Sequence, residues 1–268
     1  MPYSIMMDAG HGGQDPGAVY NGRQEKDDAL NLTLAVGEIL QNNGINVEYT
    51  RTTDVYLTPI ARAREANNAG VDLFISIHRN SFPRDNDVSG VETLVYNLSG
   101  LKLEIAEEIN EQLEALGFVN LGVKARPNLV VLRRTKMPAL LVEAGFINSD
   151  IDNKLFDSNF NAIAQAIAFA VLDVLEENNL IPDDTNSPDA NMTPGSSNRI
   201  YRVQVGAFRN RGYANRLVNE LLEMDFPAYI YDSGEFYRVG VGGYNTLNEA
   251  AEMERRLKSE GYQTVIVY

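Results

Sequence analysis

The chain has 268 residues, a formal net charge of −14 and no cysteine. The acidic balance argues against a nucleic-acid partner, because proteins that bind phosphate backbones gather lysine and arginine. Without cysteine there are no disulfides or thiolate metal sites, so any metal must be held by His, Asp or Glu. No stretch approaches the ~18 uncharged apolar residues that would span a bilayer, and we expect a soluble protein with no membrane partner. Residues 1–8 show no signal peptide and suit a strand instead.

The first 180 residues alternate short β-rich runs with amphipathic helical stretches. The predicted strands are Tyr3–Asp8, Ile45–Thr50, Leu73–His78, Val91–Tyr96, Leu129–Leu132 and Ala139–Glu143. The predicted helices between and after them are Asp28–Asn43, Pro59–Ala69, Leu101–Leu116 and Phe160–Glu177. This alternation predicts an α/β fold with a mostly parallel sheet and helices on both faces. In such sheets, functional sites lie at the carboxyl ends of the strands.

Residues 181–198 break this pattern. Three Pro, three Ser, a Gly and three Asp replace the helical periodicity, as is typical of a flexible linker. The charge changes as well, because residues 1–180 hold 14 basic and 25 acidic side chains, whereas residues 199–268 hold nine of each. We therefore predict an acidic first domain over 1–180 and a neutral second domain over 199–268, joined by this linker.

The second domain contains an internal repeat. Tyr201–Phe208 recurs 36 residues later as Tyr237–Tyr244, and each copy precedes a helical stretch and another strand. A duplicated β-α-β unit predicts a small βαββαβ sandwich with one antiparallel sheet and two helices. Alternation along the strand places Arg202 and Gln204 on the face that the helices leave free to bind. Sheets of this kind also bind RNA, but that needs stacking aromatics and a basic surface, and neither is evident; a purely structural role is the other alternative.

The chain has only two histidines, His11 and His78, and each ends a predicted strand of the first domain. A lone histidine is more often a structural hydrogen-bonding residue, but two at strand ends favour a metal site. The glycines around His11 allow a sharp turn and a close approach to a bound group. Zinc without cysteine is commonly held by two His and a carboxylate. Glu25, in a polar loop before the first long helix, is the best third ligand; alternatively it only stabilises the first turn of that helix.

Glu143 is a second unusual carboxylate. It ends what the sequence predicts to be a buried central strand, Ala139–Glu143. A buried glutamate is costly unless it is paired or functional, so we favour a functional role.

Ordered motifs throughout the first domain carry a family resemblance. They are Asp8–Ala18, Glu25–Lys26 with Asn31–Leu32, Thr50–Arg51 with Asp54, Ser76–Asn80, Val131–Arg133 and Met137–Phe146. Together they resemble the zinc-dependent N-acetylmuramoyl-L-alanine amidases of the amidase type 3 family. The likeness covers nearly all of residues 1–180.

This resemblance implies a role for each matching residue. One Zn²⁺ per chain would be held by His11, Glu25 and His78, and Glu143 would be the catalytic carboxylate. The substrate-binding residues that the matching motifs contain are Arg51 and Asn80. One departure is Arg79, where the family often has a small residue, which puts substrate contacts in doubt rather than zinc binding.

The second domain resembles a sporulation-related (SPOR) repeat over residues 199–268. This family binds the glycan strands of peptidoglycan, typically those stripped of their peptide stems. The repeated strands predict the glycan-binding residues Arg202, Gln204 and Arg238, with Phe208 as a flanking aromatic residue.

The implied function is that of a peptidoglycan hydrolase. It would cleave the amide between the lactyl group of N-acetylmuramic acid and the L-alanine of the stem peptide, by zinc-activated water, at the cell wall and outside the cell. We expect a monomer with peptidoglycan as its partner. Two alternatives are a zinc peptidase that cuts within the stem peptide and a non-catalytic wall-binding protein. The second would be expected to have lost a ligand or the catalytic glutamate, and all four residues are present.

Overall fold

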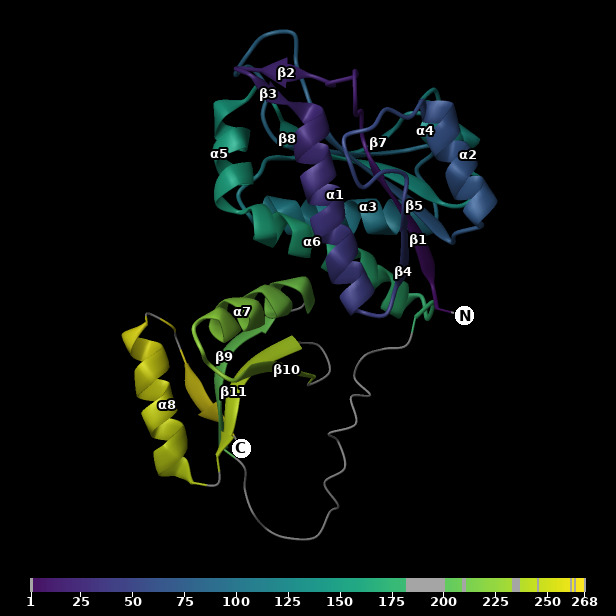
Figure 1. Ribbon diagram of the computed structural model, residues 1–268. Helices are drawn as coiled ribbons and strands as arrows, with labels where there is room; N and C mark the ends of the chain where they lie inside the picture. Colours follow the sequence, from purple (N-terminus) through teal and green to yellow (C-terminus); the bar gives the residue numbers. More distant parts are fainter. Residues whose placement is uncertain are drawn as a thin grey trace. The chain divides into compact units, whose positions relative to one another are not determined.

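A computed structural model describes residues 2–181, 201–208, 211–232, 237–244, 246–260, 262 and 264–267 (Figure 1). The chain divides into two compact units, Met1–Pro182 and Asp183–Tyr268. Most of the predicted linker, residues 182–198, lies outside the described residues.

A six-stranded sheet forms the centre of the first unit. Its strands, in spatial order, are β4 (Asn46–Tyr49), β1 (Ser4–Ala9), β5 (Leu73–Asn80), β8 (Ala139–Phe146), β6 (Val91–Val95) and β7 (Asn120–Ala125). All neighbouring strands are parallel except β8 and β6, which are antiparallel. The predicted mostly parallel sheet is therefore confirmed. His78 lies towards the carboxyl end of β5, and the parallel register brings the end of β1 beside it.

Helices cover both faces of this sheet, as the alternation of elements predicted. The larger hydrophobic core lies on the face covered by α1 (Glu25–Asn42), α3 (Leu101–Glu114) and α6 (Phe160–Glu177). A smaller core lies on the other face, under α2 (Pro59–Ala69) and α4 (Val130–Arg134). Successive residues of a strand point to opposite faces, so Phe74 joins the smaller core and Ile75 the larger one.

The ends of α2 follow from local sequence signals. The Thr58 hydroxyl accepts a hydrogen bond from the Ala61 amide, Pro59 occupies the first turn, and Gly70 ends the helix in the left-handed conformation. Among the described helices, none alone has the length and apolar character to cross a membrane. The bent pair of α5 (Asp150–Ser158) and α6 meets those two criteria, but α6 contributes to the larger core.

One predicted strand is wrong. Leu129–Leu132 is not a strand, because residues 130–134 form α4, which packs Val131 and Leu132 into the smaller core. A four-residue apolar run fits a buried strand and a short helix equally well, so periodicity could not decide between them. The sixth strand of the sheet is instead β7, which contains a glycine and a lysine that hide its strand character. The short hairpin of β2 (Val19–Tyr20) and β3 (Arg23–Gln24) was also missed.

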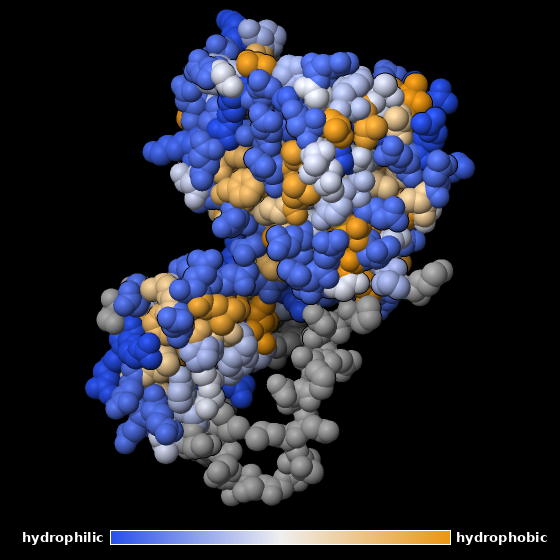
Figure 2. Space-filling model, viewed as in Figure 1, coloured by the Kyte–Doolittle hydropathy of each residue, from blue (hydrophilic) through white to orange (hydrophobic). Residues whose placement is uncertain are grey.

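The second unit has the predicted βαββαβ order. Its elements are β9 (Tyr201–Phe208), α7 (Arg211–Glu223), β10 (Ala228–Asp232), β11 (Tyr237–Tyr244), α8 (Leu247–Ser259) and β12 (Val265–Val267). The strands form one antiparallel sheet in the order β10-β11-β9-β12. Val203, Val239 and Val241 pack with the helices in a separate hydrophobic core. Figure 2 shows mostly hydrophilic side chains, with smaller apolar groups between them, on the visible face of both units.

Candidate metal centre

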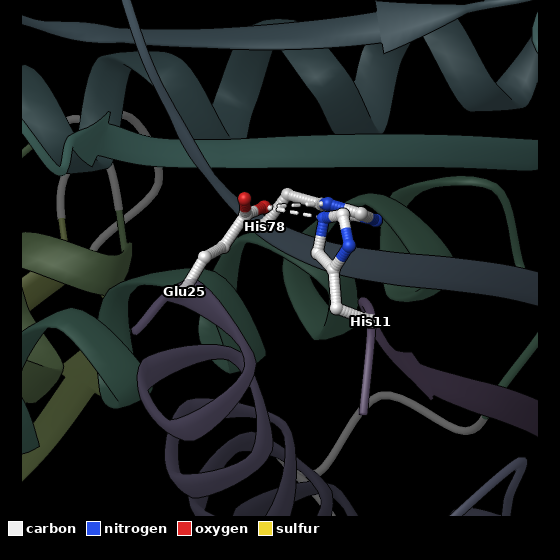
Figure 3. A group of neighbouring side chains, drawn as sticks. All are labelled: His11, Glu25 and His78. Atoms are coloured by element: carbon white, nitrogen blue, oxygen red, sulfur yellow. Dashed lines mark hydrogen bonds and ion pairs between the residues drawn. The ribbon is translucent and has the colours of Figure 1, made fainter. Parts of the chain in front are cut away.

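His11, Glu25 and His78 meet at the carboxyl edge of the central sheet (Figure 3). One ligand atom from each residue lies within 4.8 Å of the other two. Glu25 Oε1 is 3.1 Å from His11 Nε2 and 2.8 Å from His78 Nδ1. The two imidazole rings are 5.0 Å apart between centroids and nearly perpendicular, at 78°. Two nitrogens and a carboxylate oxygen thus converge on one point.

Glycines on both sides of the cluster make this convergence possible. A Cβ atom at Gly10 would lie 2.4 Å from the His78 ring, and a Cβ at Gly17 would lie 2.6 Å from Glu25 Oε2. Gly17 also has a positive φ of 67°, which disfavours other residues. Any side chain at either position would displace a residue of the cluster.

A buried polar network fixes the strand end from which His11 projects. Asp8 is fully buried and accepts hydrogen bonds from the hydroxyls of Thr50 and Ser76, each at 2.6 Å, and from Arg62 Nη1 at 2.8 Å. Arg62 also donates to the carbonyl of His11, at 2.5 Å. These bonds hold the backbone around His11, which itself has a positive φ of 59°.

The structure corrects the predicted role of Arg51. Its guanidinium is buried and donates to the backbone carbonyls of Ala9 at 3.0 Å, Gly10 at 2.7 Å and Lys26 at 2.9 Å. A side chain committed in this way joins the His11 loop to the start of α1. Arg51 is therefore a structural clamp for the cluster and not a substrate contact.

The carboxylate and the imidazoles stabilise one another. Burial alone would raise the pKa of Glu25, but hydrogen bonds from His11 and His78 outweigh burial and lower it far below its usual value. Burial likewise disfavours protonated His11, but hydrogen bonds and charge attraction from Glu25 and Asp15 raise its pKa overall. Glu25 is thus ionised at neutral pH, as a metal ligand must be.

Asp15 is a residue of the site that the sequence analysis did not single out. Its Oδ2 lies 3.0 Å from His11 Nδ1, on the side of the ring opposite to Glu25, and its Oδ1 accepts a hydrogen bond from the Gly17 amide. A carboxylate behind a metal-ligating histidine fixes its tautomer and orientation. Its place in the Asp8–Ala18 motif, four residues after His11, was the available signal.

Glu143 lies on β8, directly beside His78 in the strand register. Within the described residues, its Oε2 atom is buried and has no hydrogen-bond partner. Burial raises the pKa of Glu143 to about 7, with a further increase from the negative charges of Glu25 and Glu92 and an opposing effect of His78. An unpaired carboxyl group with a pKa near neutrality, next to a metal-binding cluster, suits proton transfer.

Asn80 lies at the end of β5 and hydrogen-bonds within the protein. Its amide donates to Glu92 Oε1 at 2.9 Å, and its carbonyl accepts from the Ser81 amide at 2.8 Å. Glu92 is buried on β6 and is the register partner of Glu143. The predicted contact of Asn80 with substrate stays a prediction.

The Arg79 side chain points away from the metal cluster, towards α1 and α5. It is buried, donates to Asp28 at 2.6 Å and Asn153 at 2.7 Å, and its guanidinium carbon lies 4.1 Å from the centroid of the Phe156 ring. Arg79 thereby ties β5 to α1 and α5.

Replacing Arg79 should therefore destabilise the fold. We expect Arg79→Leu to lower the free energy of unfolding by about 3 kcal/mol, because it removes a buried guanidinium together with its hydrogen bonds to Asp28 and Asn153, although Arg23 still pairs with Asp28. Chemical denaturation measures this loss. Arg84→Leu is the control, since Arg84 forms an exposed ion pair with Asp87 and its loss should cost less than about 1 kcal/mol. Equal effects of the two substitutions would contradict the role given to Arg79.

A cavity of about 260 Å³ adjoins the cluster, with His11 and His78 among its lining residues. Its walls are mostly apolar. They come from the start of α2 and the residues before it, from the start of α4 and from strand β8, and they include Leu57, Pro59, Leu129, Val130 and Leu141. The cavity places an apolar surface next to the point where the ligand atoms converge.

In the second unit, three of the four predicted glycan-binding residues lie together on the helix-free face of the sheet. Gln204 Oε1 accepts hydrogen bonds from the Tyr231 hydroxyl at 2.9 Å and from Arg238 Nη1 at 3.1 Å. The Arg202 guanidinium lies 5.1 Å from the Tyr231 ring centroid. Tyr229 adds a second ring 6.1 Å from that of Tyr231. Both tyrosines were missed, although alternation with Ala228 and Ile230 in β10 places them on this face.

Phe208 does not share that face. The register of β9 against β11 skips one residue between Gln204 and Gly206, so the side chains after this β-bulge switch faces. The Phe208 ring packs with the hydrophobic core and stacks on Tyr213 of α7, with centroids 6.2 Å apart. Phe208 is therefore not on the face that holds the other three residues, and its contact with glycan stays a prediction.

Comparison with known proteins divides the chain into the same two units. The model of the family described as N-acetylmuramoyl-L-alanine amidase matches residues 5–173, and that of the SPOR domain matches residues 197–268. The chain belongs to the N-acetylmuramoyl-L-alanine amidase family and carries a SPOR domain. It is a peptidoglycan amidase.

Individual relatives agree with this assignment. The sporulation-specific N-acetylmuramoyl-L-alanine amidase of Bacillus subtilis (strain 168) is 36% identical over 231 residues, which cover 84% of this chain and 83% of the relative. The catalytic domain of the amidase CwlV from Bacillus (Paenibacillus) polymyxa var. colistinus has a TM-score of 0.60 at 32% identity, with 66% of this chain and 99% of that one covered. An N-acetylmuramoyl-L-alanine amidase from Clostridium difficile 630 has a TM-score of 0.61 at 29% identity, with coverage of 69% and 99%.

Proposed function

We propose that His11, Glu25 and His78 hold one Zn²⁺ and that Glu143 is the proton-transferring residue of the amidase. The observation that carries this proposal is the convergence of the three ligand atoms within 4.8 Å, with Glu143 beside His78 in the strand register. The attacked bond is the amide between the lactyl group of N-acetylmuramic acid and L-alanine.

The donor atoms suit zinc. Two imidazole nitrogens and one carboxylate oxygen form a common set for catalytic zinc, which keeps a further position for water or substrate. Asp15 supports His11 from behind, as expected for a metal-ligating imidazole. In the described part of the chain, no lysine or arginine side chain occupies the place of the metal. Among the described residues, His11, Glu25 and His78 form ion pairs only with one another and with Asp15.

The chemistry divides between the metal and Glu143. Bound zinc would polarise the scissile carbonyl and lower the pKa of water towards 7. Glu143 accepts the proton of the attacking water and returns it to the departing amine of alanine. The products are a glycan whose N-acetylmuramic acid carries a free lactyl carboxylate and a free stem peptide.

Digestion of a soluble muramoyl peptide tests this proposal against the peptidase alternative. Mass analysis should find the intact stem peptide with a free amino-terminal alanine. A cut within the stem would favour the zinc peptidase. Failure of the zinc-loaded chain to cleave either bond would favour the non-catalytic wall-binding protein.

For the second unit we propose binding to glycan strands in the cell wall, through Arg202, Gln204 and Arg238 together with Tyr229 and Tyr231. Aromatic rings flanked by hydrogen-bonding side chains suit a sugar polymer. The neutral charge balance of residues 199–268 makes this binding depend little on general electrostatic attraction. Such a unit would raise the local concentration of the enzyme on its substrate.

Removal of the second unit should separate catalysis from targeting. A chain ending at residue 181 keeps the whole metal centre and the larger core, so it should hydrolyse soluble muramoyl peptides at the rate of the full chain. Whole walls should be cleared more slowly, by a factor of ten or more if tethering has its usual effect. Turbidity of wall suspensions measures the clearing rate. Equal clearing by both chains would contradict the targeting role.

A further inference from the structure

We propose that Lys124 determines specificity for the stem peptide by binding a free carboxylate on its second residue. This inference rests on the proposed function, since it concerns the peptide that leaves with alanine. The second residue of peptidoglycan stems is an isoglutamyl residue whose α-carboxyl group is either free or amidated. The structure therefore assigns to Lys124 the distinction between an acidic stem and an amidated one.

The position of Lys124 relative to Glu143 supports this assignment. His78, Glu143 and Glu92 are register partners on the adjacent strands β5, β8 and β6, and their side chains share one face of the sheet. Lys124, on β7, pairs with Leu94 two residues beyond Glu92, and its ammonium group reaches back to donate to Glu92 Oε2. A positive charge thus ends a line of side chains that begins at the metal cluster.

The length of this line fits a short peptide. Adjacent strands lie about 4.8 Å apart, so Glu92 is about one strand spacing from Glu143, and the Lys124 ammonium contacts Glu92 on that side. One extended peptide residue spans about 3.5 Å. If the alanine amine departs beside Glu143, a carboxylate on the next residue comes within reach of Lys124.

Lys124 also has donors to spare beside its bond to Glu92. Its side chain is 38% exposed, and an ammonium group has three donors, of which Glu92 takes one. Four other cations near the centre are engaged elsewhere. Arg51 and Arg62 bind backbone carbonyls, Arg79 lies on the opposite face of the sheet, and Lys26 pairs with Asp54.

The charge of the domain makes such a cation necessary for an acidic stem. Residues 1–180 have an excess of eleven acidic side chains, and Glu25, Glu92 and Glu143 all lie near the expected path of the peptide. A second carboxylate would be repelled there without a local positive charge. Glu92 orients the ammonium group and is itself held by Asn80.

The test compares two muramoyl tripeptides in which the γ-carboxyl group of the second residue is linked to the third residue: in the acid the α-carboxylate of the second residue is free, and in the amide it is a carboxamide. For the zinc-loaded full chain we expect kcat/KM to be about tenfold higher for the acid, as for a charge-assisted hydrogen bond at a partly exposed site. In Lys124→Met this ratio should fall to about one, whereas Lys124→Arg should retain most of it. Each ratio is measured on one enzyme preparation, so partial loss of folded protein cancels.

Arg126→Met is the matched control, because it removes an equal charge from an exposed side chain two residues away. It should leave the acid-to-amide ratio within about twofold of the original chain, a change that weak screened attraction would produce. A ratio of one in the original chain, an unchanged ratio in Lys124→Met, or an equal fall in Arg126→Met would each overturn the inference. In all three results both substrates are still cleaved, so the proposed function stands. Cleavage of neither substrate by the zinc-loaded chain would instead refute that function.

Discussion

Glu143→Gln should retain zinc and the fold but lose about 10²-fold or more in kcat, the range typical for loss of a general acid–base residue. The substitution keeps the shape of the side chain and removes its ability to accept a proton. Steady-state kinetics on a soluble muramoyl peptide, with zinc content measured on the same sample, checks both parts. Near-normal turnover would show that another group, and not Glu143, transfers the proton.

The same substitution has a second readout in the metal-free protein. Burial raises the pKa of Glu143 from 4.5 to about 7, so the folded state binds this proton more tightly than the unfolded state. The resulting stability is complete below about pH 4.5 and is lost as the pH rises to about 7. Glu143→Gln should therefore gain up to about 3 kcal/mol relative to the original chain between pH 4 and pH 8. A difference in unfolding free energy that does not change with pH would show that Glu143 is an ordinary exposed carboxyl group.

Substitution of either histidine should abolish stable zinc binding. His11→Ala or His78→Ala leaves two of three ligand side chains, and we expect zinc affinity to fall by more than about 100-fold, beyond the usual effect of losing an outer-shell partner. Metal analysis after dialysis against a weak chelator measures this. Asp15→Asn is the graded control and should weaken binding by about 10- to 100-fold, because it removes only the support behind His11. Full zinc in either histidine variant would refute the ligand assignment.

The convergence of His11, Glu25 and His78 could be predicted because parallel strands bring their carboxyl ends to one edge and the chain has only two histidines. The role of Arg51 could not be predicted in this way. Its position in a matching motif indicates importance near the site, but only the folded backbone shows that its hydrogen bonds go to carbonyls of the His11 loop. A motif therefore identifies residues that a site needs without separating those that touch substrate from those that hold the loop.

The errors in the fold have similarly local causes. Leu129–Leu132 is too short for its periodicity to separate strand from helix, and its packing against α2 decides the outcome. Phe208 was predicted as an aromatic residue flanking the binding face, but a single skipped residue in β9 turns its ring towards the core and Tyr213. A β-bulge is set by pairing with the neighbouring strand, and the sequence of one strand does not reveal it.

Hydrolysis of purified cell wall in heavy-oxygen water distinguishes zinc-dependent cleavage of the lactyl amide from every other cut. We predict one heavy oxygen atom in the lactyl carboxylate of the glycan product and none in the released stem peptide, with both products absent after zinc removal and restored when zinc is returned. Heavy oxygen in a carboxyl group of the stem peptide, or cleavage that survives complete removal of metal, would contradict this prediction.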